Sequence, residues 1–166
     1  MLHSSQDERT RDSIQDVAAE FEVCARRAVE CLLNRPTLLS KAFRLRKPSA
    51  VESGIRCFIA SGNSDQTLMI SLGLSKSDLR SLFPDEKDEE MGLDAIGEMV
   101  NIIAGTLFRR PGFRSRFDRL RTSVPSFAAP SFEMEQARIV RGVLKVGEAH
   151  LILELAVKPC NCGGKA

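Results

Sequence analysis

Residues 93–107 read LDAIGEMVNIIAGTL, and their spacing predicts a helix with two contrasting faces. At about 100° per residue, the apolar residues form one broad stripe, which is typical of a helix packed on a core: Leu93, Ile96, Val100, Ile103, Ala104 and Leu107. A second stripe, here called the polar ridge, steps by four, three and four residues and consists of Asp94, Glu98, Asn101 and Gly105. Glycine inside a helix costs about 1 kcal/mol relative to alanine, so Gly105 is an unusual choice and leaves a bare spot beside Asn101.

The two central residues of the polar ridge have complementary hydrogen-bonding chemistry. The amide of Asn101 both donates and accepts hydrogen bonds, which suits it to orient a water molecule. The ionised carboxylate of Glu98 only accepts, which suits it to bind a cation such as a lysine side chain. Glutamate and asparagine at this spacing also occur on the solvated face of ordinary amphipathic helices, so a plain surface stripe stays as an alternative.

The pattern Asp-x3-Glu-x2-Asn-x3-Gly resembles the helix signature of the CheC/CheX/FliY chemotaxis phosphatase family, and the sequence DAIGEMVNIIAG is most similar to the CheX-like members. The resemblance covers residues 94–105, and outside them it rests on the order of the expected elements. It implies a CheC/CheX-like α+β fold, in which two long helices pack on a largely antiparallel sheet. It also implies a phosphatase that removes the phosphoryl group from the aspartate of a phosphorylated CheY-type response regulator.

The resemblance also implies a role for each residue of the polar ridge. Asn101 would orient the attacking water, and Glu98 would pair with the active-site lysine of the response regulator. Asp94 would contact the partner at the rim of the site, and Gly105 would leave it room. The protein would need no cofactor of its own, because the response regulator would supply Mg²⁺. Pairing of two copies through a sheet edge, as a homodimer, is a further implication.

A second copy of the motif is missing from the first half of the chain. The two-site CheC type carries an earlier Glu-x2-Asn on its first long helix. Here Glu30 and Asn34 are four residues apart and no glycine follows at the required distance. The resemblance therefore points to a single-site, CheX-like arrangement. A non-catalytic adaptor, which would bind a receiver domain through the same ridge, is the alternative function.

The composition of the whole chain predicts one domain. The 166 residues are 43% hydrophobic, which is enough to bury one core. The 24 Lys and Arg against 22 Asp and Glu give a net charge of +2, too small for a general attraction to nucleic acid or to anionic membranes. No apolar run approaches the roughly 20 residues that span a bilayer, and the start HSSQDE is unlike a signal peptide. We therefore expect a cytoplasmic protein without a membrane partner.

The cysteines indicate neither a disulfide framework nor a metal site. They are five in number and scattered, at Cys24, Cys31, Cys57, Cys160 and Cys162. Neither His3 nor His150 has the short spacing to the last two that a zinc site usually shows. We expect small buried residues and a C-terminal tail, with no metal bound.

The remaining patterns predict the other elements of the α+β domain. In chain order these are a helix at 13–33, a weak strand at 38–47, a hairpin of strands 55–60 and 66–72, a short helix at 77–83, and a second hairpin of strands 139–146 and 149–157. We expect Ser13 with Asp16 to cap the first helix, Ser75 to cap the short one, and the second hairpin to close the sheet. Residues 1–12 are expected to be a polar N-terminal extension, 13–158 a single CheX-like phosphatase domain, and 159–166 a flexible tail.

Residues 108–121, here called the Arg/Phe segment, hold six arginines and three phenylalanines. Interleaved arginines and aromatic rings can bind single-stranded nucleic acid, which makes nucleic-acid binding a rival function. The sequence has no tyrosine or tryptophan, however. We therefore favour phenylalanines that pin the segment to the core and arginines that face water or an acidic partner.

Overall fold

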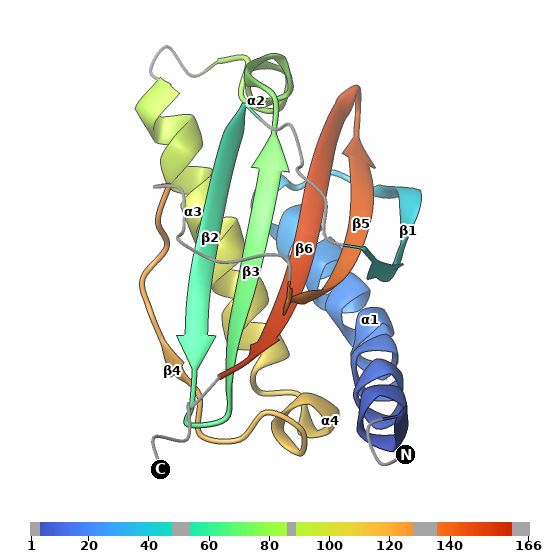
Figure 1. Cartoon of the computed structure of the whole chain (residues 1–166). Coiled ribbons are helices and arrows are strands. Elements are labelled where there is room, and N and C mark those ends of the chain that lie inside the picture. Colours follow the sequence, from blue (N-terminus) through green and yellow to red (C-terminus); the bar gives the residue numbers. More distant parts are fainter. Residues whose placement is uncertain (1–3, 48–53, 86–88, 128–135, 161–166) are drawn as a thin grey trace.

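The computed structural model describes residues 4–47, 54–85, 89–127 and 136–160, which form helices packed on a single sheet (Figure 1). The helices are α1 (Ser4–Leu33), α2 (Lys76–Leu82), α3 (Glu89–Leu107) and α4 (Pro111–Arg114). The strands are β1 (Leu38–Arg46), β2 (Ile55–Gly62), β3 (Gln66–Leu74), β4 (Arg121–Thr122), β5 (Arg138–Val146) and β6 (Ala149–Pro159). The predicted α+β class is confirmed. None of the helices in this part of the chain is long and apolar enough to cross a membrane.

The strands form one antiparallel sheet in the order β1-β5-β6-β3-β2-β4. The β5–β6 hairpin therefore lies in the middle of the sheet, and the prediction that it closes the sheet is wrong. The run LILELAV in β6 is apolar almost without interruption, which is typical of a strand buried on both faces. Leu153, Glu154 and Leu155 are indeed all fully buried, although they point alternately to the two faces.

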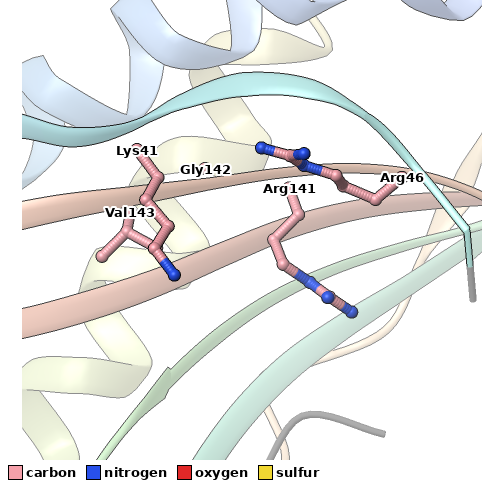
Figure 2. Close-up of a pocket in the computed structure, with 5 residues that line it drawn as sticks. All are labelled: Lys41, Arg46, Arg141, Gly142 and Val143. Atoms are coloured by element: carbon pink, nitrogen blue, oxygen red, sulfur yellow. The ribbon is translucent and has the colours of Figure 1, made fainter. Parts of the chain in front are cut away.

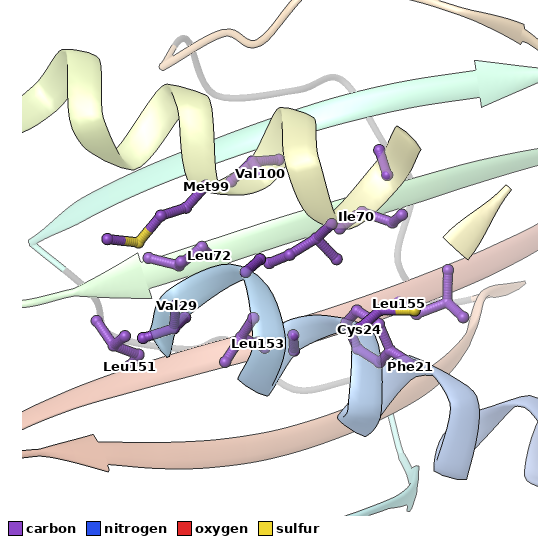
Figure 3. Packing of buried hydrophobic residues seen from close by; sticks show 14 of the residues in the cluster. Phe21, Cys24, Val29, Ile70, Leu72, Met99, Val100, Leu151, Leu153 and Leu155 are labelled. Carbon is purple, nitrogen blue, oxygen red and sulfur yellow. The ribbon is translucent and has the colours of Figure 1, made fainter. Parts of the chain in front are cut away.

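Helices α1 and α3 lie side by side on one face of the sheet, α3 against β2 and β3 and α1 against β1 and β5 (Figure 1). Figure 3 shows Met99 of α3 beside Leu72 of β3, and Phe21 of α1 beside Leu155 of β6. All four side chains are fully buried. Burial of one such side chain contributes about 1.5–3 kcal/mol, so this layer between helices and sheet is the main source of stability.

The first helix is longer than the sequence pattern predicts. Helix α1 begins at Ser4, so Ser13 and Asp16 lie inside it and the predicted cap at Ser13 is wrong. Residues 4–12 contain neither glycine nor proline, so nothing in them ends the helix. At its other end Asn34 has a φ of 50°, the left-handed conformation that commonly follows a helix.

The C-terminal strand extends into the residues expected as a tail. Strand β6 continues to Pro159, and the N–H of Cys160 donates a hydrogen bond to the carbonyl oxygen of Asp65 (2.8 Å). The remainder of the expected tail, residues 161–166, lies outside the described residues.

Helix α2 begins with the predicted cap at Ser75. The Ser75 hydroxyl oxygen accepts a hydrogen bond from the N–H of Asp78 (3.0 Å), while Asp78 Oδ2 accepts from the N–H (3.2 Å) and the hydroxyl (2.6 Å) of Ser75. Asp78 Oδ1 also accepts from the N–H of His150 (3.1 Å), which ties α2 to β6. Burial alone would raise the pKa of the Asp78 carboxyl, but the bonds from Ser75 and His150 outweigh it and lower that pKa.

Candidate functional site

Helix α3 buries its apolar stripe and presents the polar ridge to solvent. Ile96, Val100, Ile103, Ala104 and Leu107 are buried, and Leu93 is half-buried. The ridge residues Asp94, Glu98 and Asn101 are exposed, and Gly105 is half-buried. Since Glu98 and Asn101 are three residues apart on the helix, their side chains lie next to each other on its outer surface. The structure thus brings the predicted site residues together on one surface.

The functional groups of the polar ridge are left free by the described residues. Within the described parts of the chain, the side chains of Asp94, Glu98 and Asn101 make no hydrogen bond or ion pair with another residue. An exposed carboxylate and an exposed amide keep their full hydrogen-bonding capacity for water or for a partner. The ridge is therefore accessible without any rearrangement of the side chains around it.

Gly105 leaves a gap that none of the residues placed by the structure fills. No heavy atom lies within 4 Å of the position that a Cβ would take at Gly105. At Gly92, on the buried side of the same helix, a Cβ would lie 3.3 Å from the Leu79 side chain. Gly92 therefore serves packing within the domain. Gly105 serves no such contact, and its gap is open to the outside next to Asn101.

One side of the polar ridge is bordered by the chain that follows β4. A Cβ at Gly97 would lie 3.8 Å from the Cβ of Pro125, so Pro125 sits directly against α3. Backbone hydrogen bonds hold this segment along β2: the Ser123 N–H donates to Ala60 (2.8 Å), and Phe58 and Ser126 donate to each other's carbonyl oxygens (3.0 Å each). The neighbouring Val124 is 78% exposed. Sequence analysis did not place this segment beside the ridge, because no local pattern encodes such a long-range contact.

The Arg/Phe segment, which includes α4, is anchored by its rings. Phe113 and Phe117 are buried with ring centroids 4.6 Å apart, and Phe108 stacks on Phe113 at 5.3 Å. Five of the arginines are exposed, and one of them, Arg116, pairs with Asp16 of α1 (2.8 Å). The prediction that the phenylalanines pin the segment to the core is confirmed. Because these rings are packed against each other, they do not offer the free faces on which bases stack.

The described residues contain no group of three or more His, Cys, Asp and Glu side chains that could hold a metal ion. The four described cysteines are free thiols, with Cys24 and Cys57 buried, Cys160 half-buried and Cys31 exposed. The expectation of a buried residue is therefore wrong for Cys31, which lies on the solvent side of α1. Cys162 is outside the described residues.

The fold is that of the CheX/CheC-like chemotaxis proteins. A crystal structure of the chemotaxis protein CheX from Desulfovibrio desulfuricans matches with a TM-score of 0.66 and 13% identity, over 86% of this chain and 99% of that chain. The CheX–CheY–BeF3–Mg²⁺ complex from Borrelia burgdorferi matches with a TM-score of 0.55 and 14% identity, over 83% of this chain and 95% of that chain.

A protein that does not carry the name CheX or CheC has the same fold. The middle domain of FliM from H. pylori matches with a TM-score of 0.61 and 9% identity, over 95% of this chain and 94% of that chain. No protein-family model matches the sequence, and no curated protein matches it either. At these identities the likeness establishes the α+β, CheC/CheX-like fold, and any statement about activity has to come from the site.

Proposed function

We propose that this protein is a phosphatase that hydrolyses the phospho-aspartate of a CheY-type response regulator. The observation that carries the proposal is the exposed pair Glu98 and Asn101 on α3, with no partner in the described chain and with the open gap at Gly105 beside it. Inside the CheX-like fold, this ridge supplies the groups that such a reaction needs and leaves them accessible to a second protein.

In the proposed mechanism the reaction centre belongs mostly to the partner. An acyl phosphate is already activated, so positioning a water molecule in line with the phosphorus atom supplies much of the acceleration. Asn101 would enter the partner's site and hold this water through its amide oxygen and N–H. Glu98 would pair with a lysine of the partner and fix the orientation of the two proteins. Mg²⁺ would be bound by the response regulator.

The comparisons support the choice of partner. The Borrelia burgdorferi structure contains CheX in complex with CheY, BeF3 and Mg²⁺, which makes a receiver domain the first partner to test for a chain of this fold. Asp94 lies at the start of the ridge, one turn before Glu98, where it would contact the rim of the partner. The gap at Gly105 would let the backbone of the partner approach α3.

The test is the rate at which a phosphorylated CheY-type receiver from the same organism loses its phosphate. Wild-type protein at substoichiometric amounts should accelerate the loss, and Asn101→Ala and Glu98→Ala should each reduce this acceleration at least about 100-fold, because a mispositioned reactant commonly costs that much. Glu148→Ala is the matched control, since Glu148 is an exposed acid on the β5–β6 turn. Equal activity of all four proteins would refute the roles given to Glu98 and Asn101.

The alternative function is a non-catalytic adaptor that binds a receiver domain through the same ridge. The likeness to the FliM middle domain favours keeping it, because proteins with different names share the fold. An adaptor would bind the phosphorylated receiver without changing its decay. Binding measured by calorimetry alongside the decay rate separates the two functions, since Asn101→Ala should remove activity in the phosphatase but has no activity to remove in the adaptor.

A further inference from the structure

The sheet carries a strong excess of positive charge. Its six strands contain nine lysines and arginines and a single acidic residue, Glu154. The register places Arg44 of β1 opposite Arg141 of β5, and Arg141 opposite Glu154 of β6. This row lies on the face of the sheet that α1 and α3 do not cover, because Leu153 and Leu155 on either side of Glu154 belong to the core under the helices. We call this side the second face.

The one carboxylate that the described strands place on the second face is already fully engaged. Glu154 is completely buried. Its Oε1 accepts a hydrogen bond from Nε of Arg141 (2.5 Å), and its Oε2 is paired with Arg56 of β2 and hydrogen-bonded by the Ser71 hydroxyl (3.4 Å). One negative charge is therefore shared by two arginines, and it has no capacity left for the cations of β1.

The cations of β1 have no counterion in the described structure. The side chains of Lys41, Arg44 and Arg46 make no ion pair or hydrogen bond with any described residue. The neighbouring Arg141 is affected by this accumulation of charge. Two causes lower the pKa of the Arg141 guanidinium: its burial, which is the larger, and the positive charge of Arg46. An anion placed between Arg46 and Arg141 would relieve the repulsion between the two guanidinium groups.

The strand pairing opens a cavity at this position. The ladder between β1 and β5 is irregular on both sides of Lys41, and such bulges re-aim side chains and are frequent next to functional sites. A cavity of about 380 Å³ lies there, lined by Lys41, Arg46, Arg141, Gly142 and Val143. Figure 2 shows Lys41 and Arg46 reaching from β1, with Arg141 on β5 extending away from β1.

Gly142 is required for the shape of this region. The ring of Phe43 packs from the helix side so closely that a Cβ at Gly142 would overlap it. Because residues along a strand alternate between the two faces, Gly142 points to the helix side and Val143 to the second face, so the floor of the cavity is formed by the Gly142 backbone and the Val143 side chain. Arginine and lysine side chains are the groups with which proteins most often bind phosphate.

We propose that this cavity binds the phosphate group of a small molecule. A dianionic phosphate matches several uncompensated positive charges better than a single carboxylate does, and the planar guanidinium of Arg46 can bind two of its oxygens at once. The volume lies within the usual range of small-molecule sites, about 300–1,000 Å³, and leaves room for an organic group beside the phosphate. The cavity is on the second face, whereas the polar ridge is on the helix layer, so this site is separate from the proposed phosphatase site.

The test measures binding of inorganic pyrophosphate and inorganic phosphate to the full-length protein by isothermal titration calorimetry at low ionic strength, with ¹H–¹⁵N spectra that follow the amide of Gly142. Pyrophosphate should bind to one site and shift the Gly142 resonance. The double variant Lys41→Gln/Arg46→Gln should weaken binding at least tenfold, because it removes two of the three cationic side chains that line the cavity. Both residues are exposed, so the variant should keep its fold, and dephosphorylation of a receiver by it should be unchanged.

A charge-matched variant and a lipid arm complete the test. Arg27→Gln/Arg80→Gln removes the same charge from exposed positions on α1 and α2, so it should bind pyrophosphate as the wild type does.

Vesicles of phosphatidylcholine with phosphatidic acid, compared with phosphatidylcholine alone, test a lipid headgroup as the source of the phosphate. Competition between these vesicles and pyrophosphate would assign a lipid, and pyrophosphate binding without vesicle binding would assign a soluble ligand. Failure of pyrophosphate to bind, or equal losses in both double variants, would overturn the proposal.

Discussion

Nε of Arg141 lies 2.5 Å from Oε1 of Glu154 at the centre of the six-stranded sheet. The carboxylate is completely buried, and the side chains of Arg141 and Arg56, which hold it from two sides, are 18% and 26% exposed. A charge in this position is stable only while its partners remain. Through Arg141, the cationic side chains of the second face are thus linked to a carboxylate inside the domain.

Replacing Glu154 should destabilise the protein strongly. Glu154→Gln removes the charge that compensates Arg141 and Arg56, and breaking a buried pair in this way costs about 3–5 kcal/mol. Urea unfolding followed by circular dichroism measures this change. Glu148→Gln, at an exposed position, should change stability by less than about 0.5 kcal/mol. The triple variant Glu154→Leu/Arg141→Met/Arg56→Leu should recover most of the loss, and a triple variant as unstable as Glu154→Gln would contradict this account.

Gly105→Ala should have opposite effects on the free protein and on its complex. No atom of the described chain lies within 4 Å of the added Cβ, and alanine favours a helix by about 1 kcal/mol over glycine, so the free energy of unfolding should rise by about that amount. If the gap admits a receiver domain, as proposed, the same methyl group should weaken receiver binding measured by calorimetry. A control is Gly92→Ala, whose Cβ would press on Leu79 and should give no gain in stability. Unchanged receiver affinity for Gly105→Ala would remove Gly105 from the interface.

Cys57 should make the stability of the protein fall at alkaline pH. Burial raises the pKa of the Cys57 thiol from 9.0 to about 11. In the unfolded chain the thiol loses its proton at the lower pH, so the unfolded state gains relative stability as the pH rises from about 9 to about 11. The loss attributable to Cys57 is on the order of 2 kcal/mol. Urea unfolding at pH 8 to 11 should show this decrease in the wild type relative to Cys57→Ala, and parallel pH profiles of the two proteins would exclude it.

Asp78 should stabilise the junction of α2 and β6 at neutral pH and lose this effect in acid. Its pKa in the folded state lies below its usual value, so its contribution is present above the pKa of the unfolded state and declines as the pH falls through the folded value. Asp78→Ala should cost about 1–2 kcal/mol at pH 7, as the loss of a capping residue does. Thermal unfolding at pH 7 and pH 3 should show a smaller difference between wild type and variant at pH 3. A constant difference would mean that the carboxylate charge is not involved.

The local elements could be predicted because their signals are local. The spacing of apolar residues in α3 predicted both its buried stripe and its exposed ridge, and Ser75 marked the start of α2. The position of the β5–β6 hairpin in the sheet could not be predicted in the same way, since its pairing with β1 and β3 depends on residues far away in the sequence. The run LILELAV of β6, apolar except for Glu154, did indicate that this strand is central.

The candidate sites differ in how much of them the sequence encodes. Glu98 and Asn101 are neighbours on one helix, so their spacing alone predicts that they lie together. Lys41, Arg141 and Glu154 come from three strands, and only the sheet register brings them to one place. The alternation of Phe43, Arg44, Leu45 and Arg46 places the two arginines on one face of a strand, but it does not show that no acid among the described residues pairs with them.

The pairing of β1 with β5 also determines when the domain can fold. Leu38 lies opposite Lys145, so most of the chain has to leave the ribosome before the first strand finds its neighbour. Topologies dominated by such distant pairings fold slowly, in milliseconds to seconds, and expose unpaired strand edges in the meantime. The newly made protein should therefore depend on chaperones until β5 and β6 are complete, and truncation before β5 should give an aggregating product instead of a smaller stable domain.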